Sequence, residues 1–248
     1  MSQLAADSTA LRLDAGELLN HTRPPRRLIV TIDGPAGTGK SSVARELALR
    51  LGLDFLDTGA MYRAATALAL DSGTDLGDEP AIAELVRQAD LRFDWTTDPP
   101  TLLARGRSIM HRLREPEVTS AVSPVSSLPA VRRVLVERQR RIGEVHQRLV
   151  SEGRDQGSVV FFDADVKIYL EASLQVRARR RADQLRREGR DADLAAIERE
   201  IADRDHRDST RAVGPLTCPD DAQRFDTSTL DQRGVVDALA RLVLARAS

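Results

Sequence analysis

The chain has 248 residues, enough for one large domain or for a core with inserts. It is 41% hydrophobic and 30% charged, as is usual for a globular protein, and its formal net charge is −1. A near-neutral total argues against general nucleic-acid binding, which needs a large positive excess, and 3% aromatic residues disfavour a base-stacking surface.

The single cysteine, Cys218, excludes an intramolecular disulfide and suits a reducing compartment. No apolar run approaches membrane-spanning length, and the N-terminus lacks the apolar core of a secretory signal. We therefore expect a cytoplasmic protein with no membrane partner. Residues 1–27 do not resemble a domain, and we expect a flexible extension or a short docked helix there.

The first predicted element is an apolar strand over residues 28–33, which leads directly into GPAGTGKS (34–41). A glycine-rich phosphate-binding loop (P-loop) has this pattern in this strand-to-helix context. Its backbone N–H groups turn toward an anion, and the helix that begins at Lys40 adds its positive end. Lys40 supplies a charge for the β- and γ-phosphates, and Ser41 a hydroxyl for the Mg²⁺ that bridges them.

The loop therefore predicts a nucleoside triphosphate site, although a glycine-rich turn that serves packing alone is the alternative. The predicted ATP-binding residues of the loop are Gly34, Pro35, Ala36, Gly37, Thr38, Gly39, Lys40, Ser41 and Ser42. After it, Val43, Leu47 and Leu51 give the helix an apolar stripe that ends at Gly52. A strand over 53–56 and a helix from about residue 60 follow. This alternation predicts a parallel sheet covered by helices on both faces.

The pattern then changes, because residues 91–95 and 101–105 alternate apolar and polar residues around a turn-rich stretch. They predict an antiparallel hairpin inserted between parallel units. A long helix is predicted from about Pro129, with an apolar stripe that extends to Leu149. The later elements are predicted as strands over 158–163 and 166–170, helices at about 173–188 and 192–206, a weak strand near Phe225 and a closing helix.

Arginines are placed where a second anion could bind. Arg63 follows a strand end, and two glycines bracket the Arg154–Asp155 pair. Arg204, Arg207 and Arg211 repeat close to helical spacing. Ligands of an open parallel sheet bind beyond the carboxyl ends of its strands, beside the P-loop. Because the planar guanidinium binds phosphate bidentately, the set predicts transfer between two phosphates. The alternative, since Arg204 alternates with aspartates, is a solvated ladder of ion pairs.

The stretch from Arg177 to Arg190 holds seven arginines. We expect an exposed helix beside the active site, with Arg177 or Arg179 meeting the ATP phosphates or covering its base. A nucleic-acid role is the alternative, which the neutral total charge disfavours.

Together these segments resemble the bacterial cytidylate kinases, nucleoside monophosphate (NMP) kinases of the P-loop class. The resemblance covers residues 28–246, and its specific part is EGRD-x-G (152–157) combined with RD-x-x-D-x-x-R (204–211). The other segments that carry it are 32–42, 56–63, 134–142, 158–161, 163–173 and 177–181.

The resemblance implies an α/β, three-layer P-loop fold with a parallel five-stranded sheet, an insert with a small antiparallel sheet and a helical lid. The domain would span 28–248, with its core at 28–85 and 129–248, the NMP-binding insert at about 86–128 and the lid at about 177–211. It also implies that ATP, with Mg²⁺, phosphorylates CMP or dCMP, and that the protein is a monomer.

Residue roles follow from the same resemblance. Arg63, Arg154 and Arg211 would hold the acceptor phosphate, and Arg204 and Asp208 would contact the sugar or the bridging phosphates. Ser123, Arg132 and Asp155 would read the cytosine edge, and Thr58 would lie close to the acceptor; for Ser123 a plain helix cap is the alternative. The implied catalytic residues are Lys40, Arg154, Asp155, Arg204 and Arg211.

Four places depart from the family pattern, one of them the last strand at Gln223-Arg224-Phe225, which is more polar than usual and looks structural. Gln156 stands where the family has an apolar residue and could alter the base contacts, whereas Phe162, in place of proline, and Gly214, in place of alanine, look structural. Two other functions stay open: a P-loop kinase for UMP or a small metabolite, and a non-catalytic module that binds a nucleoside triphosphate.

Overall fold

The computed structural model describes residues 26–247, so the prediction for residues 1–27 lies outside the described residues except at its last two positions. Five parallel strands form the central sheet, in the order β2-β6-β1-β7-β8. They are β1 (Leu28–Asp33), β2 (Asp54–Asp57), β6 (Arg148–Glu152), β7 (Val166–Glu171) and β8 (Gln223–Asp226). The predicted parallel five-stranded sheet is therefore confirmed.

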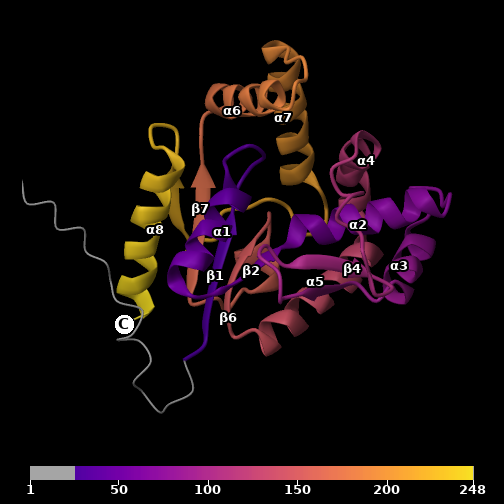
Figure 1. Cartoon of the computed structure of the whole chain (residues 1–248), viewed down its shortest axis with the longest axis horizontal. Helices are drawn as coiled ribbons and strands as arrows, with labels where there is room; N and C mark the ends of the chain where they lie inside the picture. The colour runs from indigo at the N-terminus through magenta and orange to yellow at the C-terminus, as the bar shows by residue number, and fades with distance from the viewer. Residues whose placement is uncertain (1–25, 248) are drawn as a thin grey trace, which may run out of the picture.

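Helices cover both faces of this sheet, as Figure 1 shows. On β1, Val30 and Ile32 face a cluster with α1 (Lys40–Leu51) and α8 (Gln232–Ala247). Ile29 faces the opposite cluster, which includes α2 (Thr58–Asp71) and α5 (Pro129–Val145). The side chains of a strand alternate between faces, so a strand in a sheet between two helical layers is buried on both faces, as all six residues of β1 are. The three-layer α/β fold is confirmed.

A smaller unit packs on the α2 side of the sheet. The antiparallel strands β3 (Arg92–Asp94) and β4 (Thr101–Ala104) confirm the predicted hairpin, and β5 (Arg107–Ser108) adds a third strand. Helices α3 (Glu79–Gln88) and α4 (Pro116–Ser127), which the sequence reading did not predict, share one apolar cluster with α2. That this unit is the NMP-binding insert stays a prediction.

Helices α6 (Leu174–Arg187) and α7 (Leu194–Thr210) lie close to their predicted positions. They form a small apolar cluster of their own and stand over the carboxyl end of the sheet, beyond the tip of β7 (Figure 1). Among the described helices, none is long and apolar enough to cross a membrane.

Two predicted elements are wrong. The segment predicted as a strand over 158–163 instead starts in the π-helix η2 (Gln156–Val160). The N–H groups of Val159 and Val160 donate to the Asp155 carbonyl oxygen, and that of Phe161 donates to the Gln156 carbonyl oxygen, so they are not available to a strand ladder. The long helix ends at Val145, and Leu149 lies in β6, between β1 and β2. The central sheet therefore contains β6, which was not predicted, in place of the predicted strand over 158–163.

Candidate active site

The P-loop leaves β1 through glycines whose backbone conformations other residues rarely adopt. A Cβ atom at Gly34, whose φ is +148°, would clash with the Leu170 carbonyl oxygen. At Gly37, whose φ is +79°, a Cβ would lie 3.1 Å from the Cβ of Arg177. The backbone therefore wraps closely against β7 and α6, and it reaches the first turn of α1 at Lys40.

The Lys40 ammonium is buried within its own loop. Its Nζ donates to the Pro35 carbonyl oxygen at 2.7 Å and approaches Thr38 Oγ1 at 3.5 Å. Burial, and then the nearby charge of Arg154, lower the Lys40 pKa to about 7. Because burial disfavours the charged form of Lys40, a bound anion would strongly stabilise its ammonium group. The loop is therefore suited to phosphate.

Carboxylates lie at the carboxyl ends of the strands beside this loop. The Ser41 hydroxyl donates to Glu152 Oε1 at 2.7 Å, and burial, with a contribution from Asp57, raises the Glu152 pKa to about 7. Burial likewise raises the Asp33 pKa to about 6. Hydroxyl and carboxylate oxygens are the ligands that Mg²⁺ prefers, so Ser41 and Glu152 fit an ion carried by nucleotide phosphates.

A cluster of cations faces Lys40. Arg154 Nε donates to Asp208 Oδ2 at 2.8 Å, and Arg154 Nη1 donates to the Gly153 carbonyl oxygen at 3.3 Å. Burial, followed by the positive charges of Arg154 and Arg63, lowers the Arg204 pKa to about 10. Positive charges gathered this closely repel one another, and only anions between them relieve that repulsion.

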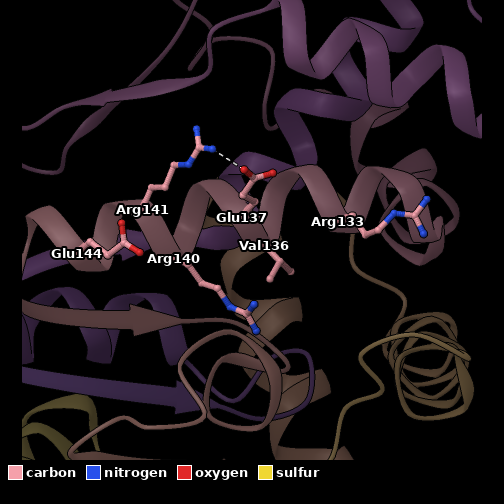
Figure 2. Close-up of a pocket in the computed structure, with 6 residues that line it drawn as sticks. All are labelled: Arg133, Val136, Glu137, Arg140, Arg141 and Glu144. Atoms are coloured by element: carbon pink, nitrogen blue, oxygen red, sulfur yellow. Dashed lines mark hydrogen bonds and ion pairs between the residues drawn. The ribbon is translucent and has the colours of Figure 1, made fainter.

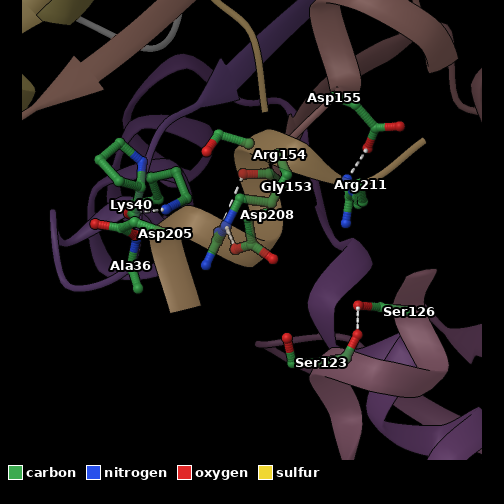
Figure 3. Close-up of polar contacts among 12 residues, drawn as sticks. Ala36, Lys40, Ser123, Ser126, Gly153, Arg154, Asp155, Asp205, Asp208 and Arg211 are labelled. Carbon is green, nitrogen blue, oxygen red and sulfur yellow. Dashed lines mark hydrogen bonds and ion pairs between the residues drawn. The ribbon is translucent and has the colours of Figure 1, made fainter. Parts of the chain in front are cut away.

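A second group of charges continues from this cluster. Arg132 and Asp155 form an ion pair in which both side chains are at most 3% exposed. Arg211 Nη2 lies 3.7 Å from Asp155 Oδ1, and Arg211 Nε donates to the Gly214 carbonyl oxygen at 2.5 Å. The Arg132 guanidinium also lies 5.4 Å from the centre of the Tyr62 ring. Figure 3 shows Arg211 and Asp155 beside the Arg154–Asp208 pair.

The structure thus brings most of the predicted acceptor-site residues together. Thr58 lies beneath them, where its Oγ1 donates to the Glu152 carbonyl oxygen at 2.7 Å. Arg154 and Arg204 lie near Lys40. Arg63 and Asp208 lie near Arg204, and Arg211 lies near Asp208, Arg132 and Asp155. Their individual roles toward a nucleotide stay predictions.

Ser123 is the exception. It lies in α4, apart from the arginines in Figure 3, and its carbonyl oxygen accepts from Ser126 Oγ at 2.9 Å. The cap alternative is wrong, because Ser123 lies inside the helix rather than at its start. The link to the site is indirect: Arg132 Nη1 donates to the Ser126 carbonyl oxygen at 3.2 Å.

Arg177, which was expected to meet ATP, contacts the P-loop backbone, and its role toward ATP stays a prediction. Its Nη1 donates to the Ala36 carbonyl oxygen at 2.9 Å and pairs with Asp205, and its Nε donates to the Ala172 carbonyl oxygen at 3.0 Å. The sequence reading assigned no role to Asp33, Glu152 or Asp205. The signal for the first two was position, since Asp33 and Glu152 are the last residues of β1 and β6.

A separate hollow of about 330 Å³ runs along the outer side of α5 (Figure 2). It is lined by Arg133, Val136, Glu137, Arg140, Arg141 and Glu144. None of these is among the predicted site residues, and Arg141 is paired with Glu137. The charge cluster at the P-loop, rather than this hollow, is the candidate active site.

A P-loop at the carboxyl edge of a parallel sheet, facing clustered arginines, defines the class of P-loop phosphotransferases. A sequence model of the cytidylate kinase family matches residues 30–245. The chain belongs to this family, which confirms the resemblance.

Curated relatives agree with this assignment. The chain is 51% identical to the cytidylate kinase of Rhodococcus jostii (strain RHA1) over 88% of this chain and 94% of that protein. It is 48% identical to the cytidylate kinase of Nocardia farcinica over 89% of this chain and 95% of that protein. For the cytidylate kinase of Corynebacterium glutamicum, the identity is 46% over 90% of this chain and 97% of that protein.

Proposed function

We propose that this protein transfers the γ-phosphate of ATP to CMP or dCMP, giving ADP and CDP or dCDP. One observation carries the proposal: the positive charges of Arg154 and Arg204 both act on buried Lys40, so the cation of the donor loop and those of the acceptor side lie close together. Membership of the cytidylate kinase family supports the choice of CMP or dCMP as acceptor.

The donor side follows from the P-loop. ATP would place its phosphates against the loop N–H groups and the start of α1, and Lys40 would exchange its hydrogen bond to Pro35 for one to a phosphate oxygen. Mg²⁺ would arrive with ATP, held by Ser41 with Glu152 beside it. When bound, the ion neutralises charge on the β- and γ-phosphates.

The acceptor side follows from the arginines. Arg63, Arg154 and Arg211 would hold the CMP phosphate, with Arg204 between it and the donor. The acceptor phosphate is already an anionic nucleophile, so no general base is needed for an in-line transfer. These residues align the two phosphates and offset their mutual repulsion, which is the largest contribution that such a site makes.

The Arg132–Asp155 pair suits the cytosine edge. Cytosine presents an amino donor and two acceptors, which match a carboxylate acceptor and a guanidinium donor. In the free protein these two side chains satisfy each other. A base that matches both can replace that pairing, whereas a base without the match would leave buried charges unpaired.

The test is steady-state ADP release with CMP, dCMP, UMP and AMP as acceptors. We expect CMP and dCMP to give the highest kcat/KM. A preference for UMP or AMP would overturn the proposal that CMP or dCMP is the acceptor. ATP binding without acceptor-dependent turnover would establish the non-catalytic module instead. That the protein acts as a monomer in the cytoplasm, without nucleic acid or a membrane, is a further proposal that rests on the resemblance and on composition.

A further inference from the structure

Both backbone polar groups of Ala36, in the P-loop, are bound by side chains from α6 and α7. The Ala36 N–H donates to Asp205 Oδ1 at 3.0 Å, and the Ala36 carbonyl oxygen accepts from Arg177 Nη1 at 2.9 Å. Arg177 and Asp205 also form an ion pair with each other. Figure 3 shows Asp205 beside Ala36 and Lys40.

The contact joins elements that are distant in sequence but close at the site. Arg177 is in α6 and Asp205 in α7, and both side chains are largely buried, at 9% and 21% exposed. A second residue of α6, Arg180, approaches the Thr38 carbonyl oxygen at 3.5 Å. The P-loop therefore lies directly against α6.

Helix α7 also carries groups of the acceptor side. Arg204 precedes Asp205 in the chain, and Asp208, one helical turn later, binds Arg154. Fixing Asp205 to the P-loop therefore fixes where Arg204 and Asp208 stand relative to Lys40. A displacement of about 1 Å at such groups is enough to cost a large factor in rate.

We infer that Asp205 and Arg177 are positioning residues that hold α6 and α7 in register with the P-loop. Asp205 does this because a carboxylate accepts from an amide and a guanidinium at the same time. The inference also sets the Ala36 N–H apart from the later N–H groups of the loop, since it is bound by protein rather than by phosphate. The structural part stands alone, whereas its effect on turnover rests on the proposed function.

The structural part is tested by hydrogen exchange of the Ala36 amide, measured by NMR in the nucleotide-free protein. We expect Asp205→Ala to accelerate this exchange at least about tenfold, because the N–H loses its acceptor. Asp203→Ala, at an exposed position of the same helix, is the matched control and should leave the exchange unchanged. Equal exchange in the wild type and Asp205→Ala would overturn the inference.

The functional part is tested by kcat and KM for ATP and CMP in Asp205→Ala, Arg177→Met and the double variant. We expect each single change to lower kcat about tenfold and to raise KM for CMP, with little further loss in the double variant. Losses that multiply in the double variant, or a lower melting temperature with kcat and KM unchanged, would overturn the positioning role.

Asp205→Asn provides a second variant if Asp205→Ala does not fold. Its amide oxygen still accepts from the Ala36 N–H, but asparagine has no charge to pair with Arg177. We therefore expect an exchange rate and a kcat between those of the wild type and Asp205→Ala. Values equal to those of the wild type would count against the ion pair. Because the exchange experiment needs no substrate, absence of CMP turnover in the wild type would overturn the proposed function and leave the inference standing.

Discussion

Arg154 Nε and Asp208 Oδ2 lie 2.8 Å apart, which ties the segment after β6 to helix α7. The side chains are 18% and 7% exposed, so the pair is mostly shielded from water. Asp208 thus orients the Arg154 guanidinium through its Nε. The remaining N–H groups of Arg154 are free to hold a phosphate, apart from the Nη1 bond to Gly153.

Replacing Arg154 with alanine should lower turnover of CMP by more than about 10²-fold, because the charge that stabilises the transferring phosphate is lost. Arg154→Lys keeps the charge without the planar guanidinium, and its turnover of CMP should lie between those of the wild type and Arg154→Ala. Arg207→Ala, exposed on α7, is the control. Steady-state kinetics with CMP decides, and a near-normal rate in Arg154→Ala would make this segment structural.

Lys40 predicts a particular dependence of stability on pH. Burial, and then Arg154, lower its pKa from 10.5 to about 7 in the folded protein. Between these values the unfolded chain binds more protons than the folded one, so the Lys40 contribution to stability rises with pH. Lys40→Met removes this contribution, and the slope of the unfolding free energy between pH 7.5 and 9.5 should become shallower.

Urea denaturation at several pH values measures this slope. The matched control is Lys167→Met, which removes a lysine that is ion-paired with Asp221 at 2.7 Å and lies outside the P-loop. Lys40→Met should also lose turnover by more than about 10²-fold without losing stability at pH 7.5, since it removes a buried charge. An unchanged slope would show that Lys40 titrates normally.

Local sequence patterns were sufficient for the P-loop and most of the sheet. Glycine spacing and the strand-to-helix transition are local, so they identify the loop without knowledge of distant contacts. They were not sufficient for β6 and η2, because both are short apolar runs that periodicity does not distinguish. A contact that is distant in sequence fixes the start of η2, because the N–H groups of its first two residues donate to the Asp33 carboxylate.

The family departures show the same limit. Gln156 was expected to affect the base contacts, but its side-chain oxygen accepts from Ser151 Oγ at 2.8 Å and its amide donates to Gln139 Oε1 at 3.3 Å. Gly214, which looked merely structural, lies against the Arg132–Asp155 pair. Neighbours in sequence gave no signal for either contact, because the partners come from other elements of the fold.

Gly214 therefore gives a sharp prediction for acceptor binding. Its φ is +58°, and a Cβ atom there would clash with Arg132 Nη2 and Asp155 Oδ2. Gly214→Ala introduces the residue that the family has here and must shift the ends of these two side chains, so we expect KM for CMP to change while KM for ATP stays unchanged. The strained backbone should in addition cost about 1 kcal/mol of stability.

Gly189→Ala separates the two effects. Gly189 has a similar φ of +71°, but a Cβ there would meet nothing within 4 Å, so this variant carries the backbone strain without the clash. It should show the loss of stability and normal kinetics with CMP. Equal KM values for CMP in the two variants would contradict the proposed contact, because the clash would then have no consequence for the acceptor site beyond that of a strained glycine position.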